Sequence, residues 1–177
     1  MDIELDDAIG VLIRYPPHYE YIKNGEPVIT IEMAKTHIQQ HGAVFWELPI
    51  IHRGVVVKHF PHAEEAKIAF FTKFPDRIVT HMGHIVASGR RDVFFDNKEL
   101  EKYVIPEYRV IWKDPSDALR TYSFLIDKII DLPKEYRIHI RNFIHSMAGK
   151  NVNHKDQLHR PRPVLIPPEF MELIDDV

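Results

Sequence analysis

The chain has 177 residues, a net charge of −3, 45% hydrophobic residues and no cysteine. Such a composition is typical of a globular protein, and it excludes a disulfide scaffold, a thiolate metal site and a cysteine nucleophile. No apolar run approaches the ~20 residues of a transmembrane helix. Residues 1–7 carry four acids and no signal-like apolar core. We therefore expect one cytoplasmic domain over residues 1–177 with no membrane partner.

The first half of the chain predicts short strands with few helices between them. Residues 8–14 are an apolar, β-rich run, followed by a short helix at 17–23 and a strand at 27–32. Residues 32–41 predict a helix that Gly42 ends. Further strands are predicted at residues 43–48, 54–60, 67–71 and 77–88.

The second half predicts more helix. Residues 97–103 form a small helix with Asp96 as its N-cap, and residues 108–112 form a strand. Residues 119–130 predict a strand, with a helix as the alternative. The clearest helical pattern covers residues 133–147, with a proline near its start and a glycine after its end. Its apolar face consists of Tyr136, Ile140, Phe143, Ile144 and Met147.

The end of the chain predicts a basic, proline-rich strand that becomes a short amphipathic helix. Arg160 and Arg162 are two residues apart, so they project from the same face if the segment is extended. Pro168 suits a first helical turn. Phe170, Leu173 and Ile174 then form one apolar face. Two arginines on one face of a strand indicate an anionic ligand.

Many short strands with small helices between them predict an α+β fold. The segment from Ile9 to Thr30, with an apolar run, Pro16-Pro17 and an Asn24-Gly25 turn, resembles the opening of ASCH domains. The segment from Arg160 through Pro163-Val164 to the terminal helix resembles the ending of EVE domains. Together the two ends resemble the PUA-like superfamily, which includes the EVE, ASCH and YTH domains. This resemblance implies a partly open mixed β-barrel of five to six strands with short flanking helices.

Basic residues gather in one part of the chain. Residues 134–163 contain seven lysines or arginines and two acids, whereas both chain ends are acidic. A basic band on an acidic body is compatible with phosphate contact. The alternative is a solvated surface with no ligand.

Aromatic residues are the second group of candidates for a recognition site, in addition to the basic residues. Phe45 and Trp46 are neighbours on a predicted strand, so we expect them on opposite faces with one outside the core. Domains of the EVE and YTH type enclose a flipped or modified base between aromatic residues, and the resemblance implies this role for Trp46, with Glu47 or a backbone group reading the base edge. The alternative for Trp46 is core packing.

Arginines complete the predicted site. Gly89 allows a close turn after a strand, and Arg90 beside it is then placed to meet phosphate. Arg120 and Tyr122 form a polar segment within an apolar strand. The predicted ligand-binding residues are Arg14, Tyr15, Trp46, Glu47, Arg90, Arg120, Tyr122, Arg160 and Arg162.

The predicted function is nucleic-acid binding, to RNA or modified DNA, with a modified base as the feature read. Hydrolases of the ASCH type carry a Lys-Thr pair after the Gly-Glu turn, whereas Pro27-Val28 follows Gly25-Glu26 here, so we predict no catalytic residue. Among the twelve histidines, His37 and His41 have the i, i+4 spacing of metal ligands on a helix, but no acidic ligand lies at a matching distance. No metal or cofactor is therefore predicted. Two alternatives stay open: a small hydrolase (amidohydrolase or nuclease) and a protein-interaction module.

Overall fold

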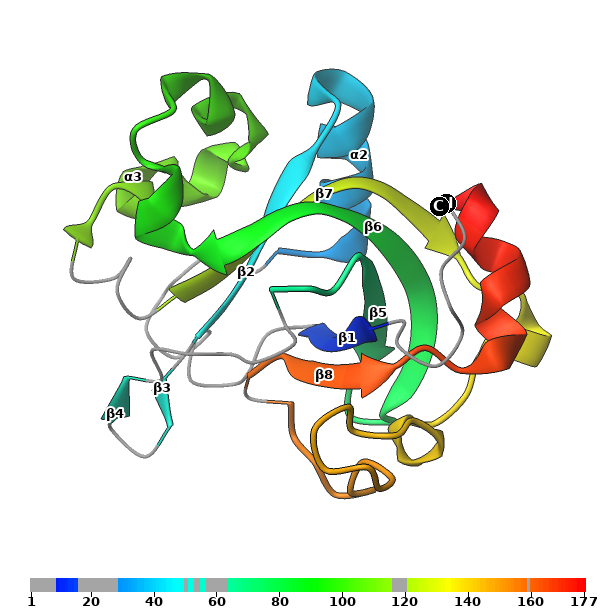
Figure 1. The fold of residues 1–177 in the computed structure, drawn as a ribbon. Coiled ribbons are helices and arrows are strands. Elements are labelled where there is room, and N and C mark those ends of the chain that lie inside the picture. Colours follow the sequence, from blue (N-terminus) through cyan, green and yellow to red (C-terminus); the bar gives the residue numbers. More distant parts are fainter. Residues whose placement is uncertain are drawn as a thin grey trace.

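A six-stranded mixed sheet organises the molecule (Figure 1). The computed structural model describes residues 9–15, 29–49, 51–52, 55–56, 64–115, 121–158 and 160–177. The strands are β1 (Ile9–Tyr15), β2 (Val44–Pro49), β5 (Ile68–Lys73), β6 (Ile78–Arg90), β7 (Thr121–Asp131) and β8 (Arg162–Leu165). They lie in the order β2-β7-β6-β5-β1-β8, and a separate hairpin pairs β3 (Ile51–His52) with β4 (Val55–Val56).

The sheet confirms the α+β class and most of the predicted strands. Only β1 and β5 are parallel, and all other neighbours are antiparallel. β6 and β7 curve strongly in Figure 1. Within the described residues, β2 and β8 remain the two edges of the sheet and do not pair with each other, so closure into a barrel is not observed.

Both faces of the sheet are covered, which explains runs of consecutive buried residues such as Val11, Leu12 and Ile13. One core contains Val11, Trp46, Phe71 and Phe124, and the other contains Leu12, Phe70, Phe143 and Phe170. Strands buried on both faces lose the alternation that marks a half-exposed strand.

The helix α2 (Ile31–His41) forms where the sequence predicts it. The Thr30 side chain accepts a hydrogen bond from the Met33 N–H at 3.1 Å, and Gly42 ends the helix with a φ of 92°. The predicted strand at 27–32 is therefore wrong at its described end, because Thr30 caps a helix. Residues 16–28, with the predicted helix at 17–23, lie outside the described residues.

The segment after β6 consists of short helices joined by turns. It contains η1 (Arg91–Phe94), η2 (Lys98–Tyr103), η3 (Pro106–Tyr108) and α3 (Arg109–Trp112). Asn97, not Asp96, caps η2 by accepting from the Glu99 N–H at 3.1 Å. The predicted strand at 108–112 is wrong, because Pro106 starts a helical turn that α3 continues.

The predicted helix at 133–147 is also wrong. Only two short 3₁₀ turns form there, η4 (Lys134–Tyr136) and η5 (Ile140–Asn142). The backbone pairs with β6 instead: Val79 N–H donates to Ile138 O at 2.9 Å, and Ile140 N–H donates to Arg77 O at 3.0 Å. Phe143 is buried against the Phe70 and Phe170 rings without a helix to present it.

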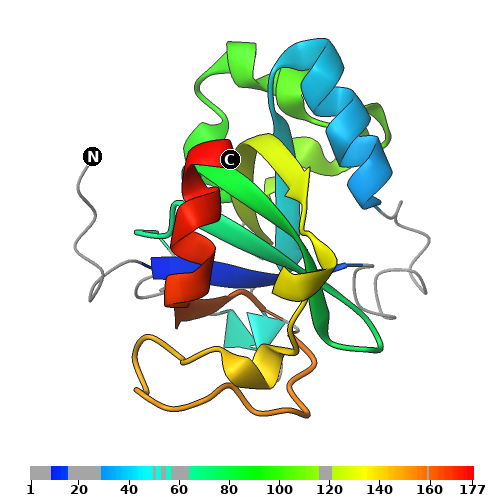
Figure 2. The ribbon, with the colours of Figure 1, turned by 90° about the vertical axis from the view of Figure 1, so that its right-hand side faces the viewer.

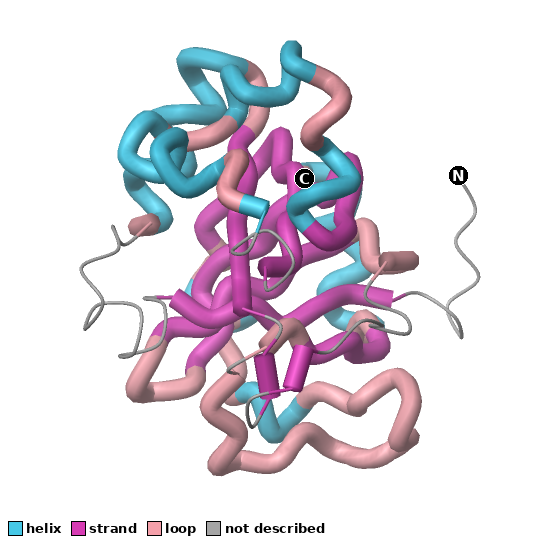
Figure 3. Tube along the Cα trace, turned by 90° about the vertical axis from the view of Figure 1, so that its left-hand side faces the viewer, coloured by secondary structure: helices cyan, strands magenta, loops and turns pink. Residues whose placement is uncertain are grey.

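The end of the chain packs beside its beginning. β8 lies antiparallel to β1, with Val11 opposite Pro163, and η6 (Pro168–Asp176) follows as a 3₁₀ helix that buries Phe170 (Figure 2). The predicted strand, double-proline stop and helix are thus confirmed. Figure 3 shows most helical segments at one end of the sheet and the long loops at the other. No helix within the described ranges is long and apolar enough to cross a membrane.

Candidate nucleic-acid interface

A basic hollow lies between the loops that connect η5 to β8. It has a volume of about 760 Å³. The side chains that carry charge or can stack there are Arg141, His145, Lys150, His154, Asp156 and Arg162, and we call this set the basic hollow. The loop runs along β8, because His145 pairs with Val164 and the Leu165 N–H donates to Ile144 O at 2.9 Å.

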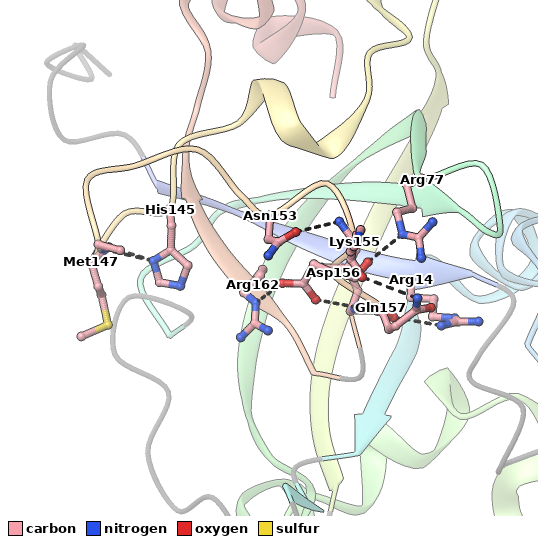
Figure 4. A network of polar contacts seen from close by, with 11 residues as sticks. Arg14, Arg77, His145, Met147, Asn153, Lys155, Asp156, Gln157 and Arg162 are labelled. Carbon is pink, nitrogen blue, oxygen red and sulfur yellow. Dashed lines mark hydrogen bonds and ion pairs between the residues drawn. The ribbon is translucent and has the colours of Figure 1, made fainter.

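Two arginines, Arg14 of β1 and Arg77 of the β5–β6 turn, bind this loop (Figure 4). Arg14 Nη1 donates to the Gln157 carbonyl at 2.9 Å, and Arg77 Nε donates to the Asp156 carbonyl at 3.0 Å. Both guanidinium groups also lie over the Phe74 ring, at 4.0 and 5.4 Å from its centroid. The loop is therefore anchored to β1 and to the β5–β6 turn.

Side chains of the loop fix its own shape. The Lys155 N–H donates to Asn153 Oδ1 at 2.9 Å, and Asn151 Nδ2 donates to Arg141 O at 2.7 Å. The N–H groups of Met147 and Ala148 both point at His145 Nδ1, at 3.2 and 3.3 Å. His145 Nδ1 is therefore an acceptor, and the neutral ring keeps its proton on Nε2. A loop ordered in this way loses little entropy when it binds a ligand.

The single acid of the basic hollow is already neutralised. Asp156 Oδ2 accepts from Arg162 Nε at 2.7 Å, while its Oδ1 accepts from the Leu158 N–H at 2.8 Å. Arg141 and Lys150 are exposed, and neither forms an ion pair with any acid in the described part of the chain. The basic hollow therefore carries excess positive charge.

Further arginines lie close together beside the basic hollow. Burial lowers the pKa of Arg160, and the neighbouring Arg162 lowers it further. Burial, followed by the charge of Arg77, lowers the pKa of Arg14 in the same way. Arg160 is half-buried and has no hydrogen-bond partner among the residues that are described. Arginine remains protonated in proteins, so a desolvated cation next to other cations favours an anionic ligand.

Three predicted site residues meet here. Arg14, Arg160 and Arg162 approach the same loop from β1 and from the start of β8. Sequence reasoning missed Arg77, although its place directly after the Phe74-Pro75-Asp76 turn was a usable signal. Arg120 lies outside the described residues.

The aromatic half of the predicted site does not lie near the basic hollow. Trp46 is only 2% exposed and packs edge-on against Phe71, with ring centroids 5.0 Å apart. The expectation that Phe45 or Trp46 leaves the core is wrong, because helical turns cover the other face of β2 and Phe45 packs between Phe94 and Trp112. Trp46 is thus a core residue, and no ring face is available for stacking.

Glu47 has a structural partner. It forms a bidentate ion pair with Arg91, and it also accepts from Ser123 Oγ at 3.0 Å. Glu47 and Ser123 are cross-strand neighbours on β2 and β7, and η1 places Arg91 over them. The expectation that Glu47 reads a base edge is not met, because its side chain is 6% exposed and bonded to a side chain that is 2% exposed.

Two further predicted residues, Arg90 and Tyr122, also lie elsewhere. Arg90 forms a bidentate pair with Asp92, at 2.6 and 2.7 Å. Tyr122 is opposite Arg90 on β7 and is buried, and this burial raises the pKa of its phenol to about 12. Neither residue contacts the basic hollow.

Tyr15 belongs to a second polar cluster. Arg14 and Tyr15 are neighbours on β1, so their side chains point to opposite faces of the sheet. The Tyr15 hydroxyl contacts the Thr80 hydroxyl, and Thr80 Oγ1 lies 2.8 Å from His81 Nδ1. His81 Nε2 lies 2.8 Å from Asp131 Oδ1. Thr80 and His81 are neighbours in the sequence, but no spacing in the sequence joins them to Tyr15 or Asp131.

Comparisons with known proteins return a distant likeness in structure. No family profile and no curated protein matches the chain. A solved structure of a mutant form of the ZmASCH protein from Zymomonas mobilis is similar, with a TM-score of 0.41 and 11% sequence identity over 94% of each chain. At this identity and TM-score the likeness decides neither family nor function, so the resemblance to the PUA-like superfamily stays a prediction.

Proposed function

We propose that this protein binds a single-stranded nucleic acid through the basic hollow. The observation that carries the proposal is a hollow of about 760 Å³ whose one acid is already paired and whose Arg141 and Lys150 have no acidic partner among the described residues. Phosphates are the natural counterions for such a site. The chain as a whole carries −3, so the positive charge of this region contrasts with an acidic remainder of the chain.

The contacts expected there are of the backbone type. Arg141, Lys150 and Arg160 neutralise phosphates, while Asn151 and Asn153 are held by the loop and offer their remaining amide atoms. Among the residues that the structure describes, His145 and His154 are the rings that line the basic hollow. Any base stacking in this site therefore falls to the two imidazoles, and a modified base would be read there and not by Trp46.

Fluorescence anisotropy of a labelled single-stranded oligonucleotide, as RNA and as DNA, tests the proposal across a salt series. For single strands the slope of log affinity against log salt is about −0.7 per phosphate neutralised. Removing two cations with Arg141→Ala and Lys150→Ala should weaken binding and flatten the slope by about 1.4.

A matched control removes the same charge elsewhere. Lys98→Ala and Lys128→Ala delete two exposed lysines that are absent from the basic hollow. This variant should keep the wild-type slope. If both double variants bind alike, or if the wild-type protein binds neither oligonucleotide at low salt, then the basic hollow is a solvated surface.

A further inference from the structure

A β-bulge brings two adjacent side chains of β6 into contact. His81 pairs with Phe71 and Val79 pairs with Thr72, so Thr80 is an extra residue on β6 with no partner on β5. Neighbouring side chains on a regular strand point apart, whereas a bulge re-aims one of them. Thr80 Oγ1 therefore lies 2.8 Å from His81 Nδ1, and the Thr80 carbonyl accepts from the Leu132 N–H at 2.9 Å.

The hydrogen-bond partners in this cluster indicate which atoms carry the protons. Asp131 Oδ2 accepts from Lys35 Nζ at 2.6 Å, and its Oδ1 lies 2.8 Å from His81 Nε2. The bond to Lys35 is the main cause that lowers the pKa of Asp131, so this carboxylate is an acceptor and His81 Nε2 carries the proton. His81 Nδ1 is then a lone pair that accepts the Thr80 proton. This chain of hydroxyl, imidazole and carboxylate is the arrangement that activates a hydroxyl as a nucleophile.

The protonation states of His81 and Tyr15 also favour activation of the Thr80 hydroxyl. Burial lowers the pKa of His81, against the opposing effect of Asp131, so the ring is neutral at pH 7 and has a lone pair that can accept a proton. Burial raises the pKa of Tyr15, so its phenol keeps its proton. Tyr15 contacts Thr80 and is placed to donate to an oxygen atom that gains negative charge beside that hydroxyl.

A cleft of about 390 Å³ opens in front of these groups. Tyr15, Thr80 and His81 line it, and the charged residues among its described lining are Lys73, Arg137 and Glu32. Two cations against one anion favour a substrate with a negative charge. An acyl ester is the substrate class that an activated hydroxyl attacks.

We propose that this cleft is a hydrolytic site for small anionic esters, with Thr80 as the nucleophile, His81 as the base and Tyr15 as the oxyanion donor. Thr80 Oγ1 bonds to the acyl carbon while its proton passes to His81 Nδ1. The ester C–O bond breaks, and the same proton leaves with the alcohol. Water then attacks the acyl carbon and gives one proton to His81, which returns it to Thr80 as the acid departs. Asp131 and Lys35 are positioning residues.

Hydrolysis of 4-acetoxybenzoate, an anionic acetate ester, tests the site, with neutral phenyl acetate as the comparison. The wild-type protein should hydrolyse the anionic ester faster, and peptide mass spectrometry should find an acetyl group on Thr80. His81→Asn should lower kcat by about 10²–10⁴-fold, the usual contribution of a general base. Thr80→Val should abolish the adduct, and Thr80→Ser should retain it.

The same strands supply matched controls. His84 and Asp127 form an equivalent pair on β6 and β7, 2.8 Å apart, and His84→Asn should leave the rate unchanged. Thr72 is a buried threonine on β5 whose hydroxyl has no hydrogen-bond partner in the described structure, so Thr72→Val should also be silent. Asp131→Asn should lower kcat, leave KM unchanged and shift the acidic limb of the pH–rate profile.

Three results would overturn the proposal: no hydrolysis above buffer by the wild-type protein, equal rates for wild type and His81→Asn, or an adduct on a residue other than Thr80. Circular dichroism of each variant separates loss of fold from loss of chemistry, and Thr80→Ser decides the matter if Thr80→Val does not fold. The cleft shares no lining residue with the basic hollow, so either proposal stands if the other fails.

Discussion

The ion pair between Arg91 and Glu47 offers a sharp test of how the helical segment 91–112 is attached to the sheet. The two side chains are 2% and 6% exposed, and Ser123 Oγ supplies the carboxylate with one further donor. Arg91→Met fills similar space but leaves Glu47 charged and buried. Removing one partner of a buried pair costs about 3–5 kcal/mol, so we expect a loss of that size in the free energy of unfolding.

Urea unfolding followed by tryptophan fluorescence measures the loss. Trp112 is a local reporter, because the Arg91 guanidinium lies 5.8 Å from the centroid of its ring. With an m-value of about 2 kcal/mol/M, the midpoint should fall by about 2 M urea. The double variant Arg91→Met/Glu47→Gln should recover much of the loss, since a neutral amide can still accept from Ser123 and no charge remains buried.

Arg90→Met is the matched control. Arg90 also forms a bidentate carboxylate pair, with Asp92, but those side chains are 35% and 29% exposed. Such pairs contribute about 0–1 kcal/mol. A loss of less than about 1 kcal/mol for Arg91→Met, or equal losses for both single variants, would refute the argument that burial decides the difference.

Three further outcomes follow from the core and from the histidines. Trp46→Ala should cost about 3–5 kcal/mol of unfolding free energy because it leaves a large cavity. A variant as stable as the wild type would contradict the placement of Trp46 in the core. Gly83→Ala should cost about 1–3 kcal/mol by overpacking, since a Cβ there would lie 2.9 Å from Phe71 Cε2, and a neutral result in urea unfolding would contradict that contact. Burial lowers the pKa of His81 from 6.5, so the unfolded state binds more protons and stability should rise with pH up to about 6.5. His81→Asn should make that rise shallower, and an unchanged pH dependence of the urea midpoint would contradict it.

The sequence correctly predicted those elements whose formation depends mainly on the residues within them. Gly42 ends α2 because a left-handed φ favours glycine, whichever element packs nearby. The strands β5 and β6 appear on either side of the Phe74-Pro75-Asp76 turn as their composition indicates. The terminal strand and helix follow from the prolines and from Phe170. The clustering of Arg14, Arg160 and Arg162 extends the predicted charge band.

Elements whose structure depends on contacts with residues far away in the sequence were predicted wrongly. Residues 133–147 carry a helical apolar period, but their backbone forms hydrogen bonds with Arg77, just before β6, and with Val79 in β6. Such pairing leaves no trace in the local sequence. The same holds for β2, where cover on both faces buries Phe45 and Trp46 together.

The sequence by itself determined the α+β class, the position of most strands and the excess of positive charge near the end of the chain. Only the tertiary structure decided which polar groups meet. Tyr15, Thr80, His81 and Asp131 come from three strands, and the bulge at Thr80 and the register of β6 bring them together. Register depends on the packing of whole strands and not on the polar residues they carry. The spacing of residues along the chain therefore could not predict that these side chains from different strands meet.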